Sequence, residues 1–207
     1  MVWELFGRGL IIGFSIAAPV GPIGLLCIQR TLTHGRLTGL ATGLGAASAD
    51  ALYGLIAGLG LSAAATFLTG QRVWLSAGGG LFLCYLGVRT FLAQPTTQAA
   101  GARAGGLWPA YGSAVMLTLA NPMTILSFVA VFAGLGLAGA GGGALPAAAL
   151  VGGVFVGSAA WWLLLTAVAS RVRDRLSPAG LRWVNRGAGA LLLGFGVALL
   201  AGLLRAG

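Results

Sequence analysis

Two proline motifs and one acidic residue are the features of this chain that could carry out chemistry. Residues 18–22 read Ala-Pro-Val-Gly-Pro inside one long apolar stretch, and Asn121-Pro122 lies inside another. Proline has no backbone N–H, so in a helix the carbonyl four residues earlier loses its usual partner. Such carbonyls are costly in an apolar medium unless they face protein or a water-filled cavity. Each motif therefore predicts a broken helix beside a cavity, although prolines in apolar helices also occur simply as kinks.

The third feature is Asp50, the only acid placed deep inside an apolar stretch, since Glu4 lies at an edge and Asp174 lies among arginines. An acid at the centre of a membrane costs about 2.5–3.5 kcal/mol on insertion scales, so it is rarely kept without a role. Asp50 could exchange a proton, bind a substrate ammonium group, or simply pair with a helix-end arginine or a backbone carbonyl. Tyr53 follows three residues later, on the same helical face.

Binding of a small molecule at these motifs is the functional hypothesis. Trp162, in the pair Trp161-Trp162, is a further candidate for lining the cavity. The predicted proton-coupling residue is Asp50, and no catalytic or metal-binding residue and no cofactor is predicted. The predicted substrate-binding residues are Pro19, Val20, Gly21, Pro22, Tyr53, Asn121, Pro122, Met123 and Trp162.

The composition indicates that these residues work in a membrane. Of the 207 residues 58% are hydrophobic and only 7% are charged, whereas a soluble domain carries about 25% charged residues. The net charge of +9 comes from arginines between apolar runs, which is typical of membrane topology rather than of nucleic-acid binding. There is no lysine to complete a nucleotide-binding P-loop, so transport powered by nucleotide hydrolysis within this chain is excluded.

Six stretches are long and apolar enough to cross a bilayer, which takes roughly 20 residues. The prediction is an all-α membrane protein with six transmembrane helices, of which the first and the fourth are broken. The predicted spans are 8–29, 38–68, 72–93, 110–136, 145–169 and 182–204.

The arginines predict the orientation. Nine of the twelve lie in or beside the first, third and fifth connections, and three, Arg8, Arg72 and Arg205, lie on the other side. Cytoplasmic loops carry the excess of basic residues, so both termini are predicted outside. Arginines 171–175 could also contact anionic lipid headgroups, although a role in topology alone is the simpler explanation.

A faint internal repeat accompanies this layout. Residues 80–88 and 189–197 both have glycines seven apart and end in Gly-Val, and the first and fourth spans share a proline near mid-helix. Because three spans is an odd number, the second half would be inverted, as in many secondary transporters. Residues 1–107 would form the first three-helix repeat with a cytoplasmic linker, and residues 108–207 the second. Glycine pairs four apart, such as Gly9/Gly13 and Gly153/Gly157, are interpreted as sites of close helix packing.

The combination of these motifs resembles the lysine exporter (LysE) family of bacterial amino-acid efflux transporters. The resemblance rests on Pro19–Pro22, Asp50, Tyr85-Leu86-Gly87 and Asn121-Pro122 in that order, and on the glycine-rich last span. It implies a multi-pass transporter of the bacterial inner membrane that exports amino acids or related small metabolites by proton antiport, as a homodimer. It also implies that the family's two broken helices correspond to those at Pro19–Pro22 and Asn121-Pro122.

Two positions depart from the family pattern. Met123 stands where a basic residue is common, and Gly24 stands where a polar one is. Both make the expected cavity less polar, which favours a neutral substrate over a cationic one.

Two other functions remain open from the residues. A metal-ion or inorganic-ion exporter would need several acids, histidines or thiolates, and this chain offers one acid in its spans and two separated cysteines. A membrane thiol electron carrier would use Cys27 and Cys84, which lie in apolar stretches but in no Cys-x-x-Cys motif.

Overall fold

The computed structural model describes residues 2–19, 21–58, 70–93, 106–134, 144–173 and 175–206. Within the helices, the side chains at 57–58, 72, 122–123, 132–134 and 205–206 lie outside this description. The prediction of an all-α protein is confirmed for the described ranges, in which every regular element is a helix. The helices are α1 (Val2–Ala17), α2 (Pro22–His34), α3 (Arg36–Gly58), α5 (Arg72–Leu92), α7 (Leu107–Leu119), α8 (Pro122–Gly134), α9 (Ala144–Arg173) and α10 (Pro178–Ala206).

The helices include enough long apolar segments for a multi-pass membrane protein. Three of them, in α5, α9 and α10, are each long and apolar enough to cross a bilayer. Two further spans are obtained if the bent pairs α1–α2 and α7–α8 each count as one. The described part of the predicted span 38–68, helix α3, is not among these candidates. Within the described residues, three to five spans are therefore found where six are predicted for the whole sequence.

Both bends occur at the proline motifs. The axes of α1 and α2 differ by 79° and those of α7 and α8 by 60°. Pro22 and Pro122 are the first residues of α2 and α8, where a helix needs no N–H and proline is favoured. The carbonyl of Thr118, which Pro122 cannot bond, accepts a hydrogen bond of 3.1 Å from the N–H of Asn121 instead. The prolines thus act as starts of new half-helices rather than as simple kinks.

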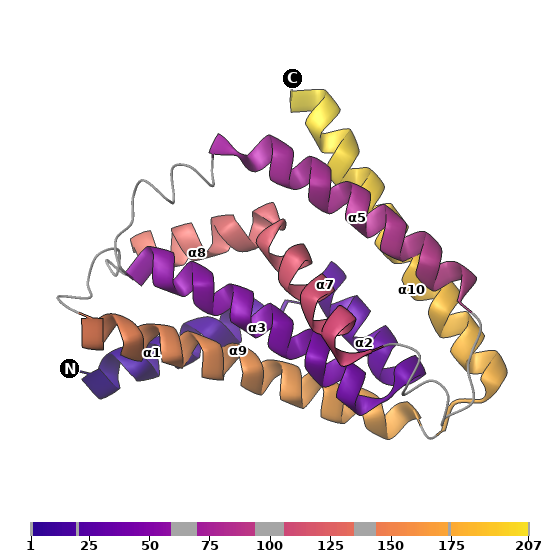
Figure 1. Ribbon diagram of the computed structural model, residues 1–207, viewed down its shortest axis with the longest axis horizontal. Helices are drawn as coiled ribbons and strands as arrows, with labels where there is room; N and C mark the ends of the chain where they lie inside the picture. Colours follow the sequence, from indigo (N-terminus) through magenta and orange to yellow (C-terminus); the bar gives the residue numbers. More distant parts are fainter. Residues whose placement is uncertain are drawn as a thin grey trace.

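Helix α9 runs along α1 and also packs against α3 (Figure 1). The contact with α1 depends on glycine: a Cβ atom at Gly153 or Gly157 would collide with backbone atoms of α1. The same holds for Gly9 and Gly13 against the backbone of α9. The interpretation of these pairs as sites of close helix approach agrees with the structure.

Helices α5 and α10 form a second closely packed pair, beside the rest of the molecule (Figure 1). Their contact uses the glycines of the two similar sequence segments. A Cβ atom at Gly87 would meet the carbonyl oxygen of Gly189, and one at Gly196 would meet that of Gly80. The segments that resemble each other in sequence therefore face each other in the structure.

Candidate functional site

A cavity of about 540 Å³ lies where the two helix breaks meet. This volume is within the range of pockets that hold small organic molecules. Its walls come from α1, α2, α3, α5, α7, α8, α9 and α10. The breaks in α1–α2 and α7–α8 position it, because each exposes the start of a half-helix to the enclosed space.

The structure brings most of the predicted site residues to this cavity. Six of them line it: Pro19, Gly21, Pro22, Asp50, Asn121 and Trp162. Tyr53 is not a lining residue, although it lies one turn from Asp50 in α3. Val20 and the side chains of Pro122 and Met123 lie outside the described residues.

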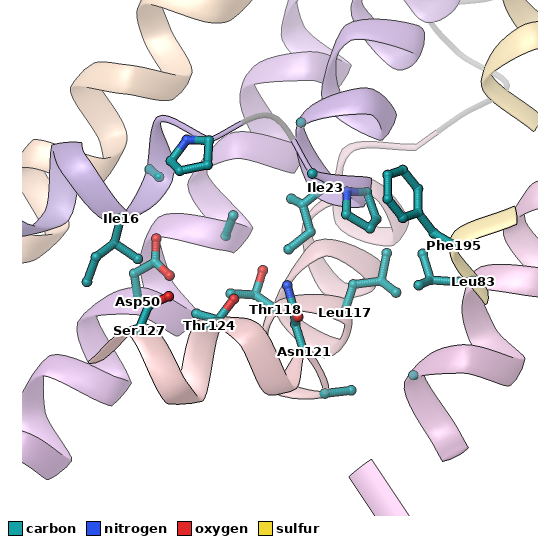
Figure 2. Close-up of a pocket in the computed structure, with 18 of the residues that line it drawn as sticks. Ile16, Ile23, Asp50, Leu83, Leu117, Thr118, Asn121, Thr124, Ser127 and Phe195 are labelled. Carbon is teal, nitrogen blue, oxygen red and sulfur yellow. The ribbon is translucent and has the colours of Figure 1, made fainter. Parts of the chain in front are cut away.

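The cavity has a more polar end, where Ile16 also lies beside Asp50, and an apolar end (Figure 2). Asp50, Ser127, Thr124, Thr118 and Asn121 follow one another along one side of it. Leu117, Leu83 and Phe195 lie toward the opposite end. In the described part of the chain, Asp50 is the one lining residue with an ionisable carboxyl group, and no arginine or histidine lines the cavity.

Asp50 is hydrogen-bonded to a residue of α9 that lies behind the cavity wall. Its carboxylate Oδ2 accepts a hydrogen bond of 2.7 Å from the hydroxyl of Ser158. The Ser158 oxygen in turn accepts a bond of 3.1 Å from Nε1 of Trp162. All three side chains are buried, with exposed fractions of 4% for Asp50, 0% for Ser158 and 5% for Trp162. Asp50 therefore lines the cavity while one of its two carboxylate oxygens, Oδ2, is hydrogen-bonded to the protein.

Tyr53 stabilises the second break rather than lining the cavity. Its hydroxyl donates a hydrogen bond of 2.7 Å to the carbonyl of Leu119, the last residue of α7. Carbonyls at a helix end lack an intrahelical partner, so an outside donor satisfies one of them. The ring packs on Phe128 of α8, with centroids 5.7 Å apart. Tyr53 thus contacts both halves of the broken helix.

A buried polar pair connects α2 to α10 beyond the cavity. Gln29 donates a hydrogen bond of 2.7 Å to Asn185 Oδ1, and Asn185 donates one of 3.1 Å to the carbonyl of Ala93. Gln29 and Asn185 are both almost fully buried. This end of α2 is therefore tied to the α5–α10 pair.

Several site residues were not predicted. Thr118, Thr124 and Ser127 line the cavity; a spacing of three residues places Thr124 and Ser127 on one face of α8, whereas Thr118 lies in α7, across the helix break. Ser158 lies four residues before Trp162, again on one face, but only the packing of α9 on α3 brings it to Asp50.

Neither alternative function gains support. Among the described residues, no group of three or more His, Cys, Asp or Glu side chains could hold a metal ion. Both cysteines are free thiols; that of Cys27 is buried and donates to the carbonyl of Gly39 at 3.5 Å, and Cys84 packs at the α5–α10 contact.

The helices indicate a multi-pass membrane protein, and a cavity lies between its two broken helices. The chain matches the LysE type translocator family over residues 14–202, and it belongs to this family. The resemblance noted from the sequence is confirmed, and so is the prediction that the chain is a transporter and not an enzyme.

Two bacterial proteins are similar in sequence to this chain. The chain is 29% identical over 201 residues to the "Putative amino acid efflux protein YcgF" of Bacillus subtilis (strain 168), a match that covers 93% of each chain. It is 32% identical over 111 residues to the "Uncharacterized membrane protein YahN" of Escherichia coli (strain K12), over 51% of this chain and 48% of that one. No solved structure matches the chain.

Proposed function

We propose that this transporter exports neutral amino acids or closely related small metabolites in exchange for protons. The observation that carries the proposal is the cavity between the two broken helices, where Asp50 is the one carboxylate among the described lining residues and an apolar wall lies at the opposite end. Membership of the LysE type translocators supports export, and the name of the Bacillus subtilis relative supports amino acids as the substrate class.

The lining of the cavity favours a neutral amino acid. The ammonium group of the substrate would bind near Asp50, and its side chain would extend toward Leu83, Leu117 and Phe195. The substrate carboxylate would face the starts of α2 and α8, because the N-terminal ends of half-helices carry partial positive charge. A cationic side chain would find no second acid among the described lining residues.

Asp50 is the proposed proton carrier because no other described lining residue is an acid. A proton and a substrate ammonium group would compete for the same carboxylate. Binding of one would then favour release of the other, which is the requirement for antiport.

The proposed architecture is six spans in two inverted halves, residues 1–107 and 108–207. Helix pairing supports it: α1 packs on α9, and α7 packs on α3, as expected if α1 corresponds to α7 and α3 to α9. The contact between α5 and α10 pairs the third span with the sixth. In this scheme α3 is the second span, and it contributes Ala46 and Asp50 to the cavity.

The proposed location is the bacterial inner membrane, with both termini outside, as the arginine distribution indicates. A homodimer and contacts with anionic lipid complete the proposal.

Transport in proteoliposomes tests this function. With an imposed pH gradient, we expect vesicles that contain the wild-type protein to accumulate radiolabelled L-leucine and to move L-lysine more slowly. Asp50→Asn should abolish accumulation driven by the gradient, because the neutral amide carries no proton, and it should weaken leucine–leucine exchange without a gradient, because an amide binds an ammonium group less tightly than a carboxylate does.

Glu4→Gln is the matched control, since Glu4 is an exposed carboxylate paired with Arg8 at 2.7 Å and far along α1 from the break. Accumulation by Asp50→Asn equal to that of the wild type would show that Asp50 does not couple transport to protons. Transport of L-lysine in preference to every neutral amino acid tested would exclude the proposed substrate class.

A further inference from the structure

The hydrogen bonds behind Asp50 have a defined direction. An indole N–H can only donate, so the Ser158 oxygen is the acceptor in its bond with Trp162 Nε1. The hydroxyl hydrogen of Ser158 is then directed to Asp50 Oδ2, 2.7 Å away. Trp162 thereby sets the direction in which Ser158 donates, and Ser158 sets which oxygen of Asp50 is engaged.

Trp162 is itself fixed in place. A side chain on Gly43 of α3 would collide with the Cβ and Cγ atoms of Trp162, so the absence of a side chain at this glycine allows the close approach. The indole also lines the cavity, whereas Ser158 lies behind it, fully buried. The two side chains come from one face of α9, four residues apart.

We propose that Ser158 and Trp162 are positioning residues that keep Asp50 Oδ2 in a hydrogen bond and so make Oδ1 the oxygen that exchanges its proton with the cavity. The inference deepens the proposed proton-coupled transport and rests on it for its functional meaning. The arrangement of the three side chains is independent of any substrate.

The hydrogen bonds from Trp162 to Ser158 and from Ser158 to Asp50 form a relay behind the carboxyl group, and Ser127 lies beside that group on the cavity side (Figure 2). Tyr53 is the titratable side chain near Asp50 on α3, and its hydroxyl is directed away, to Leu119. Within the described residues, Ser158 donates a hydrogen bond to the carboxyl group of Asp50, and that group forms no ion pair. The other ionisable side chains on helices packed against α3 are Glu4 and Arg8 of α1, Cys27, Arg30 and His34 of α2, Tyr111 of α7, and Arg171 and Arg173 of α9.

Infrared difference spectroscopy of the whole chain in lipid vesicles, recorded across pH steps, tests the relay without any substrate. The C=O stretch of a protonated carboxyl group is visible in such spectra, and its loss in Asp50→Asn identifies the Asp50 band. If the proton sits on Oδ1, the C=O oxygen is Oδ2, which accepts from Ser158. Ser158→Ala should then shift the band to higher wavenumber.

The pH midpoint of the same band gives a second readout. A hydrogen bond to the charged form favours that form, so its removal in Ser158→Ala should raise the midpoint by about one pH unit. Trp162→Phe should raise it by less, since Trp162 acts through Ser158. Ser158→Thr keeps the hydroxyl and should keep the midpoint, and Trp161→Phe is the matched control on the neighbouring tryptophan.

An unchanged band position in Ser158→Ala would place the proton on Oδ2 and overturn the assignment of Oδ1. A midpoint in Trp162→Phe equal to that of the wild type would remove Trp162 from the relay, and this conservative variant remains informative if Ser158→Ala does not fold. These spectra and the proteoliposome assay fail independently. Shifted bands without transport would contradict only the proposed function. Transport without shifted bands would contradict only the proposed positioning of Asp50 by Ser158 and Trp162.

Discussion

The guanidinium group of Arg30 donates a hydrogen bond of 3.0 Å to the backbone carbonyl of Ala110, 80 residues further along the chain. Its other amino group donates to the hydroxyl of Ser113 at 2.9 Å, and Nη1 also donates to Thr42 at 3.1 Å. One side chain of α2 is thus bound to both α3 and α7. These bonds close the arginine-rich side of the molecule beyond the helix break.

Loss of this contact should loosen α2. In a Cys84→Ser background, Cys27 is the remaining thiol; it is fully buried one turn before Arg30. We expect Arg30→Gln to increase the rate at which N-ethylmaleimide labels Cys27 by roughly tenfold, because the bonds to a charged group that hold α2 are worth about 1.5–3 kcal/mol. Arg36→Gln is the control, since Arg36 is exposed near the start of α3. Equal labelling in Arg30→Gln and in the background protein would show that Arg30 does not hold this side closed.

Two adjacent glycines of α9, Gly152 and Gly153, provide a test of the close contact between α1 and α9. A methyl group at Gly153 would collide with the backbone of α1, whereas one at Gly152 would meet only Phe6, at 3.9 Å. Gly153→Ala should lower the free energy of unfolding by about 1–3 kcal/mol through overpacking. Gly152→Ala should be neutral or stabilising by up to about 1 kcal/mol, because alanine favours a helix. Thermal or denaturant unfolding in detergent, followed by circular dichroism, measures the difference, and equal stabilities would contradict the close contact.

The apolar end of the cavity predicts that a substitution there should change the substrate specificity of transport. Phe195 lines this end and is 42% exposed, so its removal should affect the substrate more than the fold. Phe195→Ala should shift the preference from L-leucine toward L-phenylalanine by about tenfold, because added space in an apolar pocket changes selectivity by roughly 10–200-fold. Competition for leucine transport in proteoliposomes measures this ratio. Leu81→Ala, on an exposed face of α5, should leave the ratio unchanged; an unchanged ratio in Phe195→Ala would exclude the proposed orientation of the substrate.

The sequence by itself determined the class of protein and the two helix breaks. A chain with so few charges must be solvated largely by lipid, and proline cannot continue the hydrogen bonding of a helix, so both results follow from local chemistry. The motifs at Pro22 and Pro122 also indicated the family that the comparison confirms. The described residues give three to five candidate spans rather than six, and helix α3 covers only the first part of the predicted span 38–68.

Only the tertiary structure decided which side chains meet. Asp50 and Ser158 are 108 residues apart, and no local pattern relates them; they meet because glycines let α9 approach both α1 and α3 closely. Tyr53, expected in the cavity from its spacing to Asp50, instead donates to Leu119 across the bundle. Helical periodicity tells which residues share a face, but the partner of that face depends on packing between segments that are distant in the chain.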